Sequence, residues 1–341
     1  MAETKRVNLA LQGGGSHGAF TWGVLDRLLE DGRLEFEGIS GTSAGAMNAA
    51  VLAQGLHEGG REAARRGLAA FWDEIGTYAP FSPVRTTPLD LLAGNWNLDR
   101  SPGAAIIEMA QRLAPPALRN PLRLNSLATV LRNRLRTESV QACKHVKLFV
   151  AATNVETGES RIFRNAEINH DALLASACLP SLFEAVMIDG QPYWDGGYMG
   201  NPAIWPFIYE CESRDVVLVQ INPLIRAGVP KTLAEIDNRL NEITFNGALI
   251  GEMRAIAFAQ KLIEDDGASG PAIDRLKRML VHIVTDEAAM LPLGAVSKFN
   301  VEPQFLRFLH DAGRDAAERW LAATFDDLGN KSSVDIRAAF L

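Results

Sequence analysis

The sequence is poor in cysteine and has no two cysteines close together. Its three cysteines, Cys143, Cys178 and Cys211, are odd in number and widely spaced, which indicates neither a disulfide framework nor a zinc knuckle. Basic residues are not in excess either: 34 lysines and arginines stand against 41 aspartates and glutamates, a formal net charge of −7. Because a phosphate backbone selects for basic surface, nucleic acid is not an expected partner.

Long hydrophobic runs are also absent. No stretch approaches the roughly 18 apolar residues of a membrane-spanning helix, and the run Val7–Leu11 is too short for the core of a signal peptide. We therefore expect a cytoplasmic protein with reduced thiols, and leave open a transient, peripheral contact with a membrane surface. The 341 residues, 47% hydrophobic and 22% charged, suit one large α/β domain with an insertion or two modest domains.

Two successive strand–turn–helix units begin the chain. Short apolar runs predict strands at Val7–Gln12 and Phe36–Ser40, and apolar residues at helical spacing predict helices at Ala19–Glu30 and Ala46–Gln54. A glycine-rich turn joins strand to helix in each unit. Two such units predict a parallel sheet with helices packed on it.

The stretch 77–141 is rich in proline, and we interpret it as an insertion or lid, with an ordinary irregular connection as the alternative. Short helices are expected there at Ala104–Leu113 and Leu127–Leu135. Further strands are predicted at Lys147–Thr153, Ser160–Arg164, Asp215–Ile221 and Leu280–Thr285, the first two as a hairpin. Apolar stripes predict core-facing helices at Ile236–Ile256, with a break near Gly247, and at Phe305–Trp320.

The first glycine-rich turn, Gly13-x-Gly15-x-x-Gly18, supports more than one interpretation. It matches the dinucleotide-binding fingerprint, and Glu35 and Glu37 lie near the acidic position of that fingerprint. The free N–H groups at a helix N-terminus attract negative charge, which is either a pyrophosphate or the oxyanion of a tetrahedral intermediate. A tight turn that only needs positive φ is the structural alternative.

The second turn, Gly41-Thr42-Ser43-Ala44-Gly45, fits the G-x-S-x-G pattern in its strand–turn–helix context. In that context the serine stands on a strained turn with its side chain clear of the backbone, and the helix N-terminus favours developing negative charge. Gly41 and Gly45 leave room for the turn to pack. A serine that only caps the helix is the alternative.

A serine nucleophile needs a base. Downstream of Ser43, His282 lies in a strand-like run and His310 in an amphipathic helix, so both look structural, and His17 in the first turn is a weak candidate. Asp195 is the better candidate, because two aromatic residues precede it and could raise its pKa by partial desolvation. Two glycines follow it and allow a sharp loop, although Asp-Gly is also an ordinary turn.

Taken together, these motifs resemble the patatin-like phospholipases, whose pattern is a glycine-rich oxyanion loop, then G-x-S-x-G, then D-G-[AG]. The third motif here is Asp195-Gly196-Gly197, and the preceding block 175–183 also resembles the family. The resemblance covers about residues 7–55 and 147–222. One departure is His17, which stands where the family often has arginine or lysine.

The resemblance implies a three-layer α/β/α fold with a mainly parallel central sheet and a helical or irregular insertion. It places the catalytic domain at 7–222, with the insertion at about 77–141, and a mainly helical part at 223–341 packed on the same domain. It also implies hydrolysis of fatty-acyl esters of lipids without metal or cofactor. The oligomeric state is not predicted.

The implied site is a Ser43–Asp195 dyad without histidine. Backbone N–H groups of Gly13, Gly14 and Gly15, together with that of Ala44, would hold the oxyanion. The remaining glycines of the three motifs would shape the turns: Gly18, Gly41, Gly45, Gly196 and Gly197. A nucleotide-binding oxidoreductase, a non-catalytic lipid-binding module and an acyl transferase remain the alternatives.

Overall fold

The computed structural model describes residues 4–82, 84–99, 101–106, 126–264 and 276–341. The helix expected at Ala104–Leu113 therefore lies mostly outside the described residues. The strands are β1 Lys5–Leu11, β2 Leu34–Gly41, β3 Lys147–Asn154, β4 Ser160–Arg164, β5 Val186–Ile188, β6 Gln191–Asp195, β7 Asp215–Val219 and β8 Leu280–Val284. Among the described residues, the helices with defined bounds are α1 Gly18–Asp31, α2 Ala44–Gly76, α3 Pro88–Ala93, α6 Ser126–Arg134, α7 Thr137–Ala142, α8 His170–Ser176, α9 Trp205–Glu210, α10 Leu233–Glu264, α11 Glu287–Met290, α12 Pro303–Thr324 and α13 Ile336–Phe340.

One mixed sheet forms the centre of the molecule, in the strand order β5-β6-β3-β2-β1-β7-β8, with β4 also paired to β3. The pairs from β3 through β2, β1 and β7 to β8 are parallel, whereas β4, β6 and β5 are antiparallel. The predicted hairpin is present as the antiparallel pair β3–β4. The mainly parallel sheet is confirmed.

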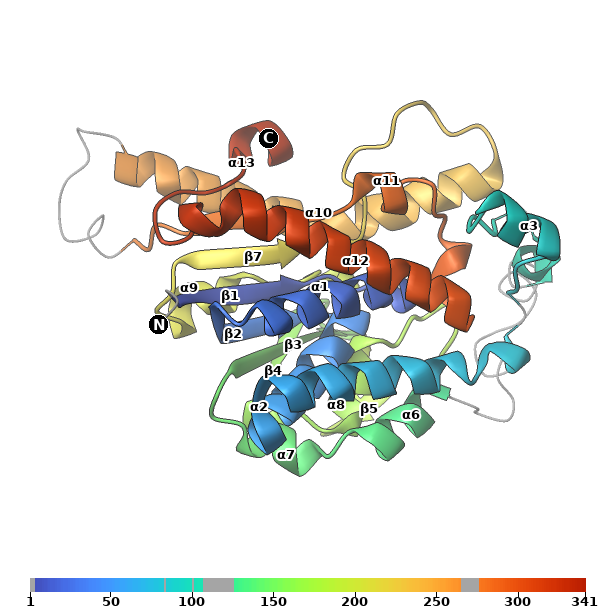
Figure 1. The fold of residues 1–341 in the computed structure, drawn as a ribbon, viewed down its shortest axis with the longest axis horizontal. Coiled ribbons are helices and arrows are strands. Elements are labelled where there is room, and N and C mark those ends of the chain that lie inside the picture. Colours follow the sequence, from blue (N-terminus) through green and yellow to red (C-terminus); the bar gives the residue numbers. More distant parts are fainter. Residues whose placement is uncertain (1–3, 83, 100, 107–125, 265–275) are drawn as a thin grey trace.

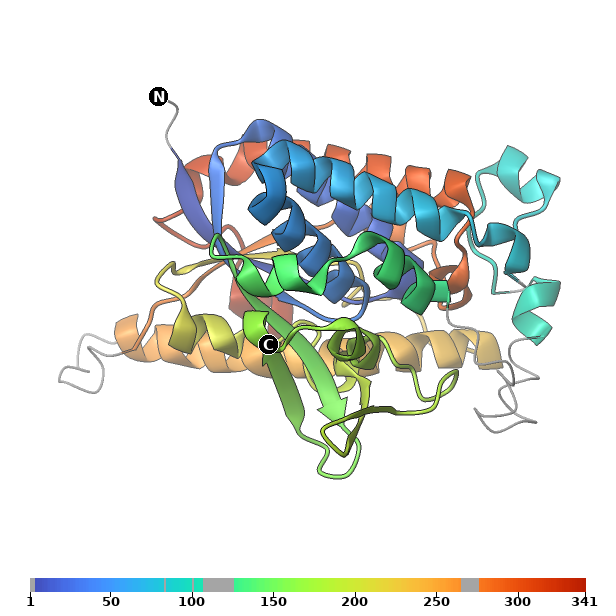
Figure 2. The ribbon, with the colours of Figure 1, turned by 90° about the horizontal axis from the view of Figure 1, so that it is seen from below.

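Helices cover both faces of this sheet. In β7 every residue is buried: Val217 and Val219 belong to the apolar cluster that includes α1, α2 and α12, whereas Val216 and Leu218 belong to the cluster that includes α9, α10 and α13. Successive side chains of a strand point to opposite faces, so the two clusters mark two helical layers. Figure 2 shows α10 on one side of the sheet and α2 with α12 on the other. The three-layer α/β/α fold is therefore confirmed.

Two helices differ from the prediction. The helix expected at Ala46–Gln54 continues to Gly76, with non-helical backbone at Gly59 and Gly60 where two helical segments meet in a kink. The helix α10 shows no break at Gly247, and Leu240 and Ile243 in its first half are exposed rather than buried in the core. An apolar stripe fixes which side chains share a helix face, but it does not fix what covers that face.

The long helix α12 packs closely on α1 (Figure 1). A side chain at Gly23 would overlap the backbone carbonyl of His310, and one at Gly313 would overlap the carbonyl of Phe20. The two helices approach so closely because both crossing points lack a Cβ.

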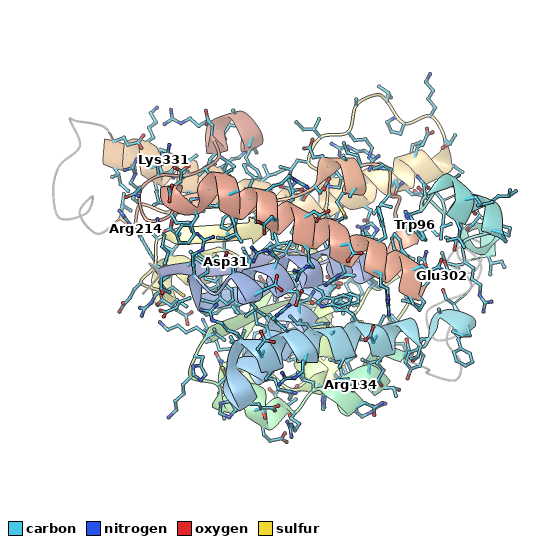
Figure 3. The ribbon with its side chains drawn as sticks, viewed as in Figure 1. Asp31, Trp96, Arg134, Arg214, Glu302 and Lys331 are labelled. Atoms are coloured by element: carbon cyan, nitrogen blue, oxygen red, sulfur yellow. The ribbon has the colours of Figure 1, made fainter. Side chains whose placement is uncertain are left out.

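The carboxyl edge of the sheet faces α3 (Figure 1). The segment around α3 is tied to α12, since Thr86 donates to Glu302 and Trp96 packs against Phe305 and Phe308. Trp96 and Glu302 are labelled at this end of the molecule in Figure 3, and Arg214 and Lys331 at the opposite end. The turns after β1 and β2 both lie at this carboxyl edge. The strand β6 runs in the opposite direction, but its last residue, Asp195, pairs with Ala152 near the carboxyl end of β3.

Candidate active site

Ser43 stands on a strained turn between β2 and α2. Its φ is 54°, in the left-handed region that a serine seldom occupies, at a typical cost of about 1–3 kcal/mol. Its backbone N–H donates to the Ser176 hydroxyl at 2.9 Å. Its side chain makes no hydrogen bond to the N-terminus of α2, although Ser43 occupies the N-cap position. Capping therefore does not explain this serine, and the strain keeps its side chain away from the helix end.

The first glycine turn lies against the serine turn. A Cβ on Gly13 would come within 2.6 Å of the Thr42 carbonyl oxygen and 2.7 Å of the Ser43 Cβ, so only glycine fits there. Gly15 has φ 58° and lies against the backbone carbonyl of Lys298. The remaining motif glycines are packed closely too, and a Cβ on any of them would overlap a neighbouring atom: Gly18, Gly41, Gly45, Gly196 and Gly197.

The backbone N–H groups around Ser43 differ in their partners. The N–H of Gly13 donates to the Asn201 side-chain oxygen at 2.6 Å, so it does not serve an incoming oxyanion. In the described part of the chain, no other group accepts from the N–H of Gly14, Gly15 or Ala44. These three donors remain for a ligand, and two of them lie at helix N-termini, where the dipole favours negative charge.

Asp195 lies at the end of β6, where β6 pairs with β3, and is 1% exposed. Its Oδ1 accepts the Gly197 N–H at 2.7 Å, as in an ordinary Asp-Gly turn. Its Oδ2 is buried and has no hydrogen-bond partner in the part of the chain that the structure describes. The turn therefore explains the position of Oδ1 but not that of Oδ2.

Burial raises the pKa of Asp195 from 3.8 to about 7. The Gly197 N–H, the Ser43 hydroxyl and the charge of Lys298 act in the opposite direction and lower that pKa, without offsetting the burial. The Ser43 hydroxyl is thus near enough to favour the charged carboxylate, although no hydrogen bond to Oδ2 is formed. Catalytic hydrogen bonds are often long without substrate and shorten in the complex.

The histidines are engaged elsewhere. His17 is buried with its Nε2 2.8 Å from the Ser297 hydroxyl, and burial, aided by the charge of Lys298, holds its pKa well below its usual value. His282 is bracketed by Asp215 at 3.0 Å and Ser333 at 3.1 Å. His310 contacts the side chain of the next residue. None of the three contacts Ser43 among the described residues.

Several buried polar residues support the site but carry no motif of their own. Gln12 bonds the Asn201 carbonyl through its amide nitrogen and the backbone N–H of Asn222 through its oxygen. Ser176 holds the serine turn. Gln12 and Asn201 directly adjoin the motifs, which is the one signal that could have pointed to them; nothing in the sequence singles out Lys298.

Cofactor sites receive little support from the described residues. No group of three or more His, Cys, Asp or Glu side chains among them could hold a metal ion. Glu37, near the acidic position of a dinucleotide site, instead accepts from the backbone of Glu212 and Ser213 and pairs with Lys147. Gly13 packs against Thr42 and Ser43, and Gly15 packs against Lys298. No contact among the described residues therefore supports the dinucleotide interpretation.

Comparison with known proteins gives a family and two distant structures. The family model for patatin-like phospholipase matches residues 9–208. No match was found among curated proteins. VipD from Legionella pneumophila aligns at 16% identity and a TM-score of 0.38, over 94% of this chain and 67% of VipD. The type III effector protein ExoU, from Pseudomonas aeruginosa, aligns at 16% identity and a TM-score of 0.33, over 94% of this chain; the chain spans about half of ExoU, 53%.

Proposed function

Since its residues 9–208 match the family model, the chain belongs to the patatin-like phospholipase family, and we propose that it is a serine hydrolase that cleaves fatty-acyl esters of lipids through Ser43 and Asp195. The observation that carries this proposal is the buried carboxyl of Asp195, whose Oδ2 has no hydrogen-bond partner among the described residues and whose pKa is lowered by the nearby Ser43 hydroxyl. A buried acceptor without a partner costs about 1–3 kcal/mol, so its retention calls for a role.

In the first half of the reaction, Asp195 takes the proton of Ser43 while the serine oxygen attacks the ester carbonyl carbon. The N–H groups of Gly14, Gly15 and Ala44 hold the resulting oxyanion. When the tetrahedral intermediate collapses, the carbon–oxygen bond of the ester breaks and the protonated Asp195 returns its proton to the leaving alcohol. An acyl-enzyme ester on Ser43 remains.

In the second half, water replaces the alcohol. Asp195 takes a proton from the water, whose oxygen attacks the acyl carbonyl, and the fatty acid departs as the Ser43 hydroxyl is restored. A carboxyl with a pKa of about 7 suits both steps, because it is basic enough to accept the proton and acidic enough to return it near neutral pH.

The test is a hydrolysis screen across p-nitrophenyl esters and phospholipid vesicles, with Ser43→Ala beside the wild type. We expect a burst of alcohol release from the wild type, labelling of Ser43 by a fluorophosphonate, and neither in Ser43→Ala. A wild type that labels but releases no fatty acid into water, and instead acylates an added alcohol, is an acyl transferase. A wild type that binds lipid without labelling is a binding module, and tight nicotinamide or flavin binding in a fluorescence titration favours the oxidoreductase.

We further propose that the lipid reaches this site from the carboxyl edge of the sheet. Large apolar side chains are exposed there around α3: Phe81 is 83% exposed, Leu89 77% and Leu92 86%. No helix among the described residues is long and apolar enough to cross a bilayer. We therefore propose a cytoplasmic protein that meets membranes peripherally, with this apolar edge in transient contact with the lipid surface.

A further inference from the structure

Lys298 lies outside residues 9–208, which match the family model, but its side chain is connected to the first glycine turn through the side chain of Asn222. The side chain is partly buried, and its Nζ donates to Asn222 Oδ1 at 2.9 Å and to Asn241 Oδ1 at 2.6 Å. The ammonium also lies 5.3 Å from the ring centre of Phe245. An ammonium has three donors and no acceptor, so each amide must turn its oxygen toward Lys298.

The orientation of the Asn222 amide decides whether its Nδ2 can donate to the first glycine turn. With its oxygen on Lys298, its Nδ2 donates to the Gly13 carbonyl at 2.8 Å and contacts Gln12 Oε1 at 3.3 Å. A flipped amide would place an oxygen against both of these oxygens. Asn222 is 1% exposed, so no bulk water can replace a lost partner.

The Gly13 carbonyl belongs to the same peptide unit as the Gly14 N–H. A trans peptide is planar, and its C=O and N–H point in opposite directions. Fixing the carbonyl on Asn222 therefore fixes the Gly14 N–H on the opposite side, where it has no partner among the described residues. Asn201 holds the preceding N–H of Gly13 at 2.6 Å, so both sides of this glycine are anchored.

We infer that Lys298 is a positioning residue for the oxyanion hole, which acts by holding the Asn222 amide and, through it, the Gly13–Gly14 peptide. The inference rests on the proposed function, since it assigns the Gly14 N–H to the developing oxyanion. It gives the C-terminal part of the chain a role in the reaction. It also places a cation near the glycine turn, where His17 stands at the position that is often basic in the family.

The charge of Lys298 also acts on the pKa of Asp195. Burial lowers the pKa of Lys298 to about 8, while Glu242 and Asp195 raise it, so the ammonium is largely charged at pH 7. Glu242 is itself paired with Arg226 and Arg239, and His17 is neutral. Burial raises the pKa of Cys178 and of Tyr198, and the charge of Asp195 raises each further. Lys298 is thus the positive side chain that lowers the pKa of Asp195.

The experiment compares Lys298→Met, Lys298→Arg and Asn222→Ala, with Lys261→Met, an exposed lysine near the end of α10, as matched control. With a soluble p-nitrophenyl ester we expect kcat of Lys298→Met to fall about tenfold to a hundredfold at little change in KM, because an oxyanion donor is misplaced. Lys298→Arg, which keeps charge and donors, should recover most of that loss, and Lys261→Met should match the wild type.

The pH profile separates positioning from a general loss of structure. In Lys298→Met the acidic limb of kcat/KM should move to higher pH, because Asp195 loses the charge that lowers its pKa. In Asn222→Ala kcat, counted per enzyme that the fluorophosphonate labels, should fall while the limb stays in place, since no charge is removed. Loss of structure would lower the amount of labelled enzyme without changing its kcat or moving the limb.

A folded Lys298→Met with wild-type kcat and an unmoved acidic limb overturns the inference while the proposed function stands. If this variant does not fold, a wild-type kcat in Asn222→Ala overturns it equally. A wild type whose hydrolysis does not depend on Ser43 removes the proposed function, and this inference with it.

Discussion

Asp195→Asn should inactivate the protein and make it more stable at alkaline pH. The wild-type carboxyl is 1% exposed and has its pKa raised from 3.8 to about 7. Between those two values the folded protein binds a proton that the unfolded chain has already released, so the free energy of unfolding falls as pH rises. This is opposite to the usual behaviour of a salt-bridged carboxylate. Asparagine keeps an oxygen for the Gly197 N–H and never ionises.

The size of the effect follows from the pKa values. Each tenfold shift in a protonation equilibrium corresponds to about 1.4 kcal/mol, so ionising Asp195 at pH 8 costs the folded state about 4 kcal/mol. At pH 5 the cost is about 2 kcal/mol, and it vanishes about one pH unit below 3.8, where both states are protonated. Asp195→Asn should therefore exceed the wild type in stability by a margin that grows from pH 4 to pH 7 and is level above it.

The measurement is chemical denaturation of both proteins from pH 4.5 to pH 8.5, followed by intrinsic fluorescence. All other titrating groups are common to the two proteins, so the pH dependence of the difference between their free energies of unfolding reports Asp195 and its coupling to Lys298. A difference that is constant across this range would refute the raised pKa, and with it the reason for assigning the base. Burst release of alcohol at pH 7 checks the loss of activity in the same samples.

Three further predictions concern the surroundings of the dyad. Gly13→Ala brings a Cβ within 2.6 Å of a backbone oxygen and should abolish ester hydrolysis. Gly247→Ala, in an open helical position, should leave hydrolysis unchanged and add up to about 1 kcal/mol of stability. Equal effects of the two substitutions on ester hydrolysis would contradict the close packing at Gly13. Ser176→Ala leaves a buried N–H without its acceptor, so it should cost about 1–3 kcal/mol in thermal or chemical unfolding and lower kcat; an unaltered kcat would show that the serine turn holds itself. Replacing Leu89 and Leu92 by serine should weaken co-sedimentation with phospholipid vesicles while hydrolysis of a soluble ester stays the same, and undiminished co-sedimentation would assign lipid contact to another surface.

The local parts of the fold could be predicted from the sequence. A strand, its turn and the following helix are encoded within about twenty-five residues, so β1 with α1 and β2 with the start of α2 were correctly placed, and the glycines pointed to the turns. The Ser43 and Asp195 motifs are also local. The fold brings them together because β2 and β6 both flank β3: Gly41, at the end of β2, pairs with Val150, and Asp195, at the end of the antiparallel β6, pairs with Ala152.

What depends on packing between distant segments could not be predicted. Gly247 looked like a helix break, but α10 continues through it, because a single glycine costs only about 1 kcal/mol and the packing of Leu249 and Met253 outweighs that. The contact between Lys298 and Asn222 joins residues 76 apart, and neither lies in a motif. The partner of the Gly13 N–H, Asn201, is likewise invisible without coordinates.

The close crossing of α1 and α12 at Gly23 and Gly313 joins an early segment of the chain to a late one. The inner strand β1 is made before its neighbour β7, which follows some two hundred residues later, and the helix that packs on α1 is made later still. Pairings so distant along a chain form slowly and leave apolar surface open meanwhile. We therefore expect nascent chains of this protein to need protection from aggregation until α12 has been synthesised, and Ser43, the proposed nucleophile, to stay inactive until then.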